Sequence, residues 1–420
     1  MIAAKTARTA FHPAPAALIA ALALGLGLGA AGTADAGPRE QAKRIHDRLV
    51  GTPPSAACLD QLEAKVAAGN ASDAALDAIT NDGGSDACTD PAFYNVTLKN
   101  FITPWTNEEQ TVFAPLNDYT ATVIGIIRDE HDFRDILSAD VIYIGNGVSP
   151  SYSNASNAHY EAMEDSGVNL ADPAQLVEST QSAVTGLAAN ATAGVLTSRA
   201  ASRAFFIDGT NRAMFRFTLL NHLCTDLEQI KDPTRPHDRV RQDVARSPGG
   251  DSRIFMNACV GCHAGMDPLT QAFAYYDWEY SDETGDNGHL VYNAAGVSDP
   301  DTGSRVQGKY LINANNFEFG FATPDDHWSN YWRAGPNSAL GWDPNLNGDG
   351  SGAKTMGMEL AHSQAFARCQ VEKVFKAVCL RGPVNATDRS QIDSMIGTFE
   401  GNGYKLKQVF ADSAAFCKGD

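Results

Sequence analysis

Residues 259–270 read CVGCHAGMDPLT, and the first five of them form a C-x-x-C-H motif. Two thiols at this spacing lie within one helical turn, from which both reach the vinyl groups of a single haem. The histidine that follows projects its imidazole toward the iron. The segment therefore predicts a helix that carries one covalent c-type haem, attached through Cys259 and Cys262, with His263 as an axial iron ligand.

The same two cysteines allow two other interpretations, a redox-active dithiol and a zinc site. A thioredoxin-type dithiol belongs to a strand–helix junction, whereas residues 253–256 (RIFM), which precede the motif, favour a helix. A zinc site needs four ligands at familiar spacing, and the next histidine after His263 is the distant His289. Haem is the favoured interpretation, and the other two stay open at this point.

A c-type haem that transfers electrons needs a second axial ligand, for which methionine and histidine are the usual choices. Met358 is the first candidate because it follows a glycine-rich loop and begins a predicted helix, a position from which a ligand can fold over the haem. Met356 and His362 are the next candidates, whereas Met266 is too close to His263 to reach the opposite face. The alternative is that these are ordinary core or surface residues.

The first 36 residues have the features of a secretory signal peptide. Lys5 and Arg8 supply positive charge before an apolar run at residues 16–31, and an A-x-A cleavage pattern ends at Ala36. A retained membrane anchor is the alternative, but the apolar run is shorter than the roughly 20 residues that a spanning helix needs. No later segment contains a spanning run, so we expect a periplasmic or secreted protein.

Six cysteines remain beside the motif pair, and an even number in an oxidising compartment predicts disulfide bonds. Cys58 and Cys88 flank a helical segment near the N-terminus and are predicted to pair. Cys369 and Cys379 are predicted to share one helix, in which their spacing separates them by about 15 Å. That separation exceeds the reach of a disulfide, about 7 Å between Cα atoms, so these two cysteines should have other partners.

Hydrophobic spacing predicts a mainly α, multi-domain protein. Helical patterns cover residues 38–80, 93–137 and 358–380, and a further helix extends from Thr210 to about Ile230. Residues 281–352 are rich in Gly, Asn and Asp, which predicts long irregular loops. The predicted parts are residues 1–36 (signal peptide), 37–90 (an N-terminal helical segment), 91–240 (a central, mainly helical domain) and 241–420 (a haem domain of the cytochrome c type).

The chain carries a net charge of −18, which argues against nucleic acid and anionic membrane surfaces as partners because both would repel it. Such a surface suits a basic redox partner protein. Residues 343–350 (DPNLNGDG) resemble the start of a calcium loop, with Gly348 at its sixth position. The twelfth position is Lys354, where a bidentate glutamate would close the site. A polar turn is favoured, and calcium is the alternative.

The motif continues into a longer pattern that is similar to a known family. Its parts are Met266-Asp267-Pro268-Leu269, Ala272-Phe273 and Tyr276-Asp277. This pattern resembles the haem segment of the large cytochrome c-like proteins first noted in planctomycetes. Weaker similarities, for instance at residues 44–49, 133–143 and 363–369, extend across most of the chain. The resemblance implies one covalent haem and a C-terminal helical module more than it implies a particular reaction.

A single haem predicts electron transfer rather than catalysis, with the redox chemistry supplied by the cofactor. The main alternative is a peroxidase- or oxygenase-like haem enzyme with an open distal position. A di-haem peroxidase is disfavoured because the sequence contains one C-x-x-C-H motif. A third possibility is a binding or scaffold protein in which the haem is incidental, a role that the large N-terminal part could support.

Overall fold

Helical elements account for far more of the described residues than strands do, and several of them have identifiable start and stop signals. The computed structural model describes residues 36–80, 87–207, 209–282 and 287–419, so the predicted signal peptide lies outside the described residues except for Ala36. In the described part, all strands are short and belong to two-stranded sheets. These features confirm the predicted mainly α class. None of the described helices is both long and apolar enough to cross a membrane.

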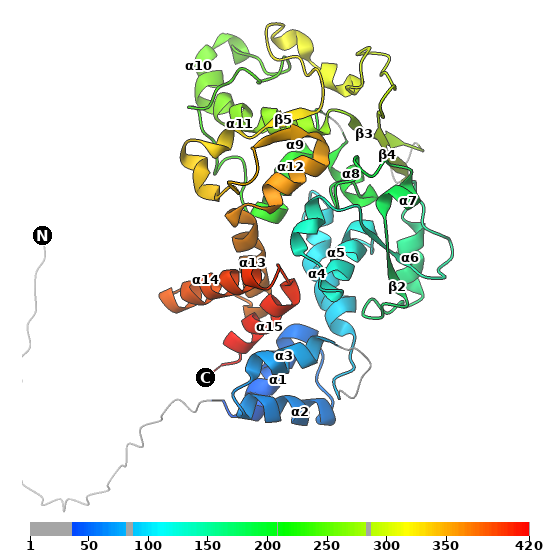
Figure 1. Cartoon of the computed structure of the whole chain (residues 1–420), viewed down its shortest axis with the longest axis vertical. Helices are drawn as coiled ribbons and strands as arrows, with labels where there is room; N and C mark the ends of the chain where they lie inside the picture. The colour runs from blue at the N-terminus through cyan, green and yellow to red at the C-terminus, as the bar shows by residue number, and fades with distance from the viewer. Residues whose placement is uncertain (1–35, 81–86, 208, 283–286, 420) are drawn as a thin grey trace, which may run out of the picture. The chain divides into compact units, whose positions relative to one another are not determined.

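The N-terminal segment consists of three helices, α1 (Pro38–Val50), α2 (Ala56–Ala67) and α3 (Ala71–Thr80), which Figure 1 shows in blue. Pro38 starts α1, and Gly51, with a φ of 80°, ends it in the left-handed conformation that favours glycine. The Ser55 hydroxyl accepts a 3.1 Å hydrogen bond from the Cys58 amide and so caps α2. Cys58 forms a disulfide with Cys88, which confirms the predicted pair.

The central part is built around the buried helix α5 (Asp118–Arg128), which Asn117 caps by accepting a 2.9 Å hydrogen bond from the Thr120 amide. Gly125 lets a ring pack directly on this helix, since a Cβ there would lie 2.2 Å from the Tyr143 side chain. Tyr143 belongs to β1 (Ile142–Gly145), which pairs antiparallel with β2 (Leu176–Ser179). The other elements of this part are η1 (Phe93–Leu98), α4 (Lys99–Ile102), η2 (Thr103–Thr106), η3 (Phe133–Leu137), α6 (Ala158–Asp165), α7 (Gln181–Thr185) and α8 (Arg199–Phe205).

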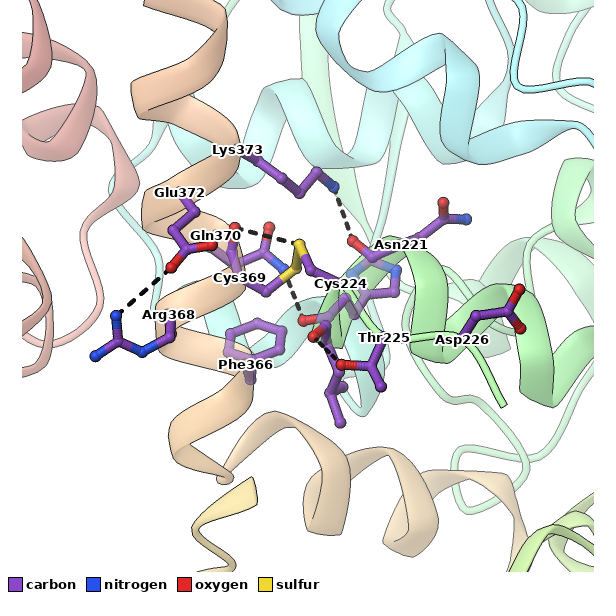
Figure 2. Close-up of a disulfide and its surroundings, with 12 residues drawn as sticks. Asn221, Cys224, Thr225, Asp226, Phe366, Arg368, Cys369, Gln370, Glu372 and Lys373 are labelled. Atoms are coloured by element: carbon purple, nitrogen blue, oxygen red, sulfur yellow. Dashed lines mark hydrogen bonds and ion pairs between the residues drawn. A yellow bond between two sulfur atoms is a disulfide. The ribbon is translucent and has the colours of Figure 1, made fainter. Parts of the chain in front are cut away.

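The helix predicted from Thr210 to about Ile230 is shorter than its hydrophobic spacing indicated. α9 (Arg212–Thr218) continues as the π-helical turn η4 (Leu219–Leu223) and ends at Cys224, which has a φ of 53°. Cys224 forms a disulfide with Cys369 (Figure 2). The predicted end was wrong because the chain turns into the left-handed conformation at the residue that forms the cross-link, although the apolar spacing continues beyond it.

The region around the C-x-x-C-H motif combines helical turns with short strands and irregular chain, as predicted for residues 281–352. Its two antiparallel pairs are β3 with β4 and β5 with β6. The elements are η5 (Pro248–Gly250), α10 (Ser252–Ile254), η6 (Phe255–Cys259), α11 (Val260–Thr270), η7 (Gln271–Phe273), β3 (Tyr276–Tyr280), β4 (Gly288–Tyr292), η8 (Gly308–Leu311), η9 (Ala314–Asn316), β5 (His327–Ser329), η10 (Tyr331–Arg333), η11 (Pro336–Leu340) and β6 (Asp349–Ser351).

The helix predicted over residues 358–380 is divided into two, α12 (Gly352–Ala361) and α13 (Gln364–Cys379). Ser363 separates them, because its hydroxyl accepts a 3.2 Å hydrogen bond from the Phe366 amide and caps a new helix. Cys369 and Cys379 share α13 and do not pair with each other, as predicted.

Two further helices, α14 (Ala386–Gly401) and α15 (Leu406–Phe416), complete the chain. α15 packs against α3, α1 and α13, so red and blue ribbons meet in Figure 1. The Phe410 and Phe93 ring centroids are 5.2 Å apart, and the Cys379–Cys417 disulfide ties α15 to α13. Residues 36–420 group into one unit of contacts. Boundaries within that unit at residues 90 and 240 stay predictions.

An aspartate in the first turn of α14 makes the free energy of unfolding depend on pH in the acid range. Hydrogen bonds from Arg381 (2.5 and 2.9 Å) and from the Val384 amide (2.8 Å) lower the pKa of Asp388 to about 2. A carboxyl group with a lowered folded-state pKa contributes stability above its unfolded-state pKa, about 4. We expect this contribution to be lost as the pH falls from about 4 toward about 2.

The Asp388→Asn variant should therefore lose stability at neutral pH and show a shallower decline of unfolding free energy over that acid range. Denaturant titrations at a series of pH values would measure both effects. Asp393→Asn, which changes an exposed carboxyl on the same helix, is the matched control. An unchanged pH profile for Asp388→Asn would contradict the assignment.

Candidate functional site

The C-x-x-C-H motif lies where one helical turn passes into the next. Asp251 caps the preceding helix by accepting a 2.9 Å hydrogen bond from the Arg253 amide, and α10, η6 and α11 then follow one another without a break. Cys259 is the last residue of η6, and Cys262 and His263 belong to the first turn of α11. This is the helical context that residues 253–256 predict, and it differs from the strand–helix junction of a thioredoxin-type dithiol.

Cys259 and Cys262 are the two free cysteines of the chain, and both are partly exposed. The six other cysteines form the three disulfides Cys58–Cys88, Cys224–Cys369 and Cys379–Cys417. Burial raises the pKa of the Cys262 thiol, and the nearby charge of Glu228 acts in the same direction. The motif pair is thus left outside the three disulfides.

A zinc site at the motif finds no support in the positions of the ligand atoms. Among the described residues, one group of three or more histidine, cysteine or acidic side chains brings its ligand atoms within 4.8 Å of one another, and it consists of Asp129, His131 and Glu178. The side chains of Cys259, Cys262 and His263 do not form such a group. Tetrahedral zinc needs four ligands at about 2 Å from one ion, so this arrangement does not match it.

His263 is oriented by a carboxylate one helical turn further along α11. Its Nδ1 lies 3.1 Å from Oδ1 and 3.2 Å from Oδ2 of Asp267, and the His263 side chain is 20% exposed. A neutral imidazole that donates its proton from Nδ1 keeps a lone pair on Nε2. No hydrogen bond or ion pair among the described residues uses that Nε2 atom. It is therefore available as a metal ligand.

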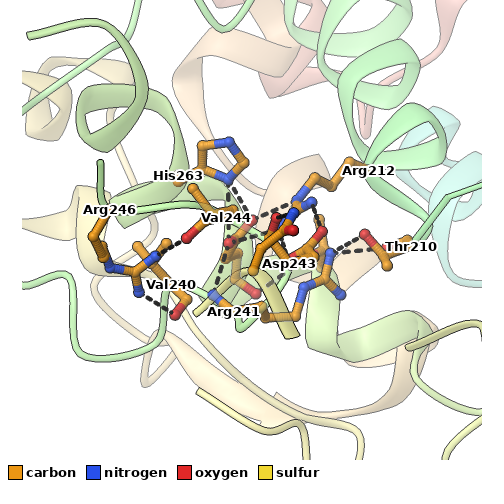
Figure 3. A network of polar contacts seen from close by, with 11 residues as sticks. Thr210, Arg212, Val240, Arg241, Asp243, Val244, Arg246 and His263 are labelled. Atoms are coloured by element: carbon orange, nitrogen blue, oxygen red, sulfur yellow. Dashed lines mark hydrogen bonds and ion pairs between the residues drawn. The ribbon is translucent and has the colours of Figure 1, made fainter. Parts of the chain in front are cut away.

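Asp267 is fully buried and is held by Arg212, the first residue of α9. Arg212 Nε and Nη2 donate to the two carboxylate oxygens at 2.8 and 2.9 Å. Burial by itself opposes the ionised form, but the charge of Arg212 and the hydrogen bond from His263 hold the pKa of Asp267 well below its usual range. Arg212 also pairs with Asp243 (Figure 3), so the guanidinium joins the Asp243 and Asp267 carboxylates.

The residues around α11 fix its position. A Cβ at Gly265 would lie 1.9 Å from Nε1 of the buried Trp332, so glycine is required where this ring lies against the helix. A cleft of about 440 Å³ opens beside η6, and its lining includes Phe255, Met256 and Phe319. Met256 is 51% and Phe319 82% exposed, which leaves apolar surface next to the motif.

The predicted second axial ligands lie on or directly after α12, which packs against η3, η7 and β6. Met356 is fully buried in the core, and Met358 is 36% exposed. His362 follows the last residue of α12, and its Nδ1 lies 2.8 Å from the Met358 carbonyl oxygen. No described contact joins Met358 to His263, so its role as a ligand stays a prediction.

The calcium-like loop uses its first carboxylate internally. Asp343 Oδ1 accepts hydrogen bonds from the Asn345 backbone amide at 2.8 Å and from its side-chain amide at 2.9 Å. This is the geometry of a polar turn, the interpretation that the sequence favours. Calcium binding by residues 343–350 stays a prediction.

The chemistry of the motif fits a covalent haem better than zinc or a redox dithiol. Two free thiols and an imidazole with an available Nε2 are the groups that c-type haem attachment uses. Sequence reasoning identified these three residues but missed Arg212 and Asp243. No protein-family model, curated protein or solved structure matches the chain.

Proposed function

We propose that the chain is an exported, single-haem c-type cytochrome that transfers electrons to or from a partner protein. One observation carries the proposal: Cys259 and Cys262 stay free while the six other cysteines are cross-linked, and they adjoin a histidine with an available Nε2. In an oxidising compartment two free thiols at this spacing need a chemical reason to stay unpaired. Attachment to haem supplies one.

Each residue of the motif has a distinct role in the proposal. The Cys259 and Cys262 thiols would hold the haem through thioether bonds to its two vinyl groups, with each S–H adding across one double bond so that the hydrogen passes to the neighbouring carbon. His263 Nε2 would bind the iron, and Asp267 holds Nδ1. When bound, the haem supplies one-electron redox chemistry. The partly exposed apolar side chains of Met256 and Phe319 supply adjoining apolar surface.

Met358 is the proposed second axial ligand. Its side chain is 36% exposed, whereas Met356 on the same helix is fully buried in the core. A methionine ligand would raise the reduction potential relative to a second histidine. The three disulfides support export to the periplasm or beyond, and the net charge of −18 supports a basic redox partner.

Covalent attachment is tested by exporting the chain from a host that attaches c-type haem. The purified protein should keep a haem-dependent peroxidase stain on a denaturing gel, and its mass should exceed that of the polypeptide by one haem. The double variant Cys259→Ser/Cys262→Ser should lose both signals. Asn257→Ser, an exposed change in the same turn, should keep them. Absence of stain and added mass from the unaltered chain would refute the proposal.

A haem enzyme with an open distal position is the second candidate. The Asp267 carboxylate on His263 favours it, because such a partner makes the imidazole a stronger donor to the metal. Carbon monoxide separates the two candidates. Electron transfer with Met358 as a ligand predicts a low-spin ferrous spectrum that carbon monoxide leaves unchanged, whereas high-spin iron that binds carbon monoxide would support the enzyme.

A further inference from the structure

The contact between His263 and Asp267 is built into α11 by their spacing. Residues four apart on a helix share a face, so the carboxylate lies beside the ring that it holds. Nδ1 is 3.1 Å from Oδ1 and 3.2 Å from Oδ2, which places the ring nitrogen between the two oxygens. A bond centred on both oxygens restrains rotation of the imidazole in addition to setting its tautomer.

The acceptor capacity of Asp267 is filled by donors from other elements of the fold. Besides His263, Oδ1 accepts from Arg212 Nε at 2.8 Å, and Oδ2 accepts from Arg212 Nη2 at 2.9 Å and from the Arg241 backbone amide at 3.2 Å. A carboxylate surrounded only by donors has no acceptor toward which it could point a proton. Asp267 is therefore fixed as an anion in a defined orientation.

Arg212 is itself held in place from its other side. Its Nη2 donates to Asp243 Oδ1 at 3.0 Å, and its Nη1 donates to the second oxygen of that carboxylate. Arg241 is also buried, and its guanidinium donates to the Thr210 carbonyl oxygen at 3.1 Å and lies over the Tyr310 ring. Two carboxylates and two guanidinium groups balance in charge, so the cluster needs no further counter-ion.

We infer that Asp267 is a positioning residue that acts through His263 to lower the reduction potential of the iron. This inference rests on the proposed function. A carboxylate that accepts the Nδ1 proton increases the basicity of the ring, and the more basic imidazole stabilises the more highly charged ferric iron. Arg212 sets the strength of the effect, because it fixes the carboxylate while withdrawing part of its charge.

The inference is tested by measuring the reduction potential of the haem-loaded Asp267→Asn variant by spectroelectrochemistry. Loss of the charged acceptor should favour the ferrous form about tenfold, an upward shift of about 59 mV for a one-electron couple. Asp267→Glu, which restores a carboxylate, should recover part of the difference. If Asp267→Asn does not fold, the Arg212→Lys variant replaces it in the test. Lysine keeps the positive charge but loses the bidentate contact, so the Asp267 carboxylate is held less tightly and the reduction potential should still change.

Asp243→Asn is the matched control, because it removes an equal charge from the same cluster at a residue that does not contact His263. A hydrogen-bond effect through His263 predicts a larger shift for Asp267→Asn than for Asp243→Asn. Equal shifts would show that Asp267 acts on the potential only through its charge, and this result would overturn the inference. If the Asp267→Asn variant stains for haem but its reduction potential is unchanged, the inference is overturned and the proposed cytochrome stands. The same holds for Arg212→Lys if that variant takes its place. Absence of haem stain from the unaltered chain would overturn both.

Discussion

Replacing Arg212 with methionine should reduce the free energy of unfolding by about 3–5 kcal/mol, because the change leaves the fully buried Asp267 carboxylate without its guanidinium partner. Methionine keeps much of the apolar stem and removes the charge and the paired hydrogen bonds. The Asp243 carboxylate, whose side chain is 10% exposed, would lose the same partner. Urea denaturation of the variant and of the unaltered chain measures the difference.

Arg216→Met is the matched control for this experiment. Arg216 also lies on α9 and also pairs with an aspartate, Asp226, but the two side chains are 46% and 29% exposed. A pair in contact with solvent contributes about 0–1 kcal/mol, so this variant should lose little stability. Equal losses in the two variants would show that the effect comes from α9 in general, not from burial of the charge on Asp267.

Removal of the Cys224–Cys369 disulfide should also cause a large decrease in the free energy of unfolding. The bond joins residues 145 positions apart. Closing so long a loop lowers the conformational entropy of the unfolded chain, which on the chain-entropy account stabilises the folded protein by about 5 kcal/mol. It links the end of η4 to α13, and Lys373 on α13 adds a 2.7 Å hydrogen bond to the Asn221 carbonyl oxygen (Figure 2). The double variant Cys224→Ala/Cys369→Ala should lose stability in denaturant titrations under oxidising conditions.

The Cys379→Ala/Cys417→Ala variant tests whether loop length is the cause. That disulfide joins residues 38 positions apart, for which the same account gives about 4 kcal/mol. Removing the disulfide that closes the longer loop should therefore lower the free energy of unfolding by about 1 kcal/mol more than removing the other one. A larger loss from the shorter loop would contradict the entropic explanation and point to packing around the individual bonds.

The parts of the site that are close together in sequence could be predicted from it. The spacing of Cys259, Cys262 and His263 indicated one helical turn, and the structure places these residues on η6 and α11. Asp267 was visible four residues after His263, a spacing that places two side chains on the same helical face. That signal was present in the sequence but was used only for its similarity to a known family.

The contacts between distant residues could not be predicted in this way. Arg212 lies 55 positions from Asp267, and no local pattern marks it as the partner of a buried carboxylate. The end of α9 was misplaced for a related reason, because the apolar spacing continues past Cys224 while the left-handed conformation of that residue ends the helix. The pairing of Cys58 with Cys88 was predictable because those cysteines are near each other in the chain.

The contact between α15 and α3 has a consequence for the order in which the protein acquires its structure. Residues 71–80 are synthesised well before residues 406–416, yet Ala75 and Ile79 on α3 are buried in the finished fold, in which α15 packs on that helix. Until the later segment arrives, α3 lacks one of the three helices that pack against it, and incompletely covered apolar surface exposes a nascent chain to aggregation. A ribosome- or translocon-stalled chain that ends before Leu406 should consequently depend on holding chaperones for its solubility, and release of the remaining residues should end that dependence.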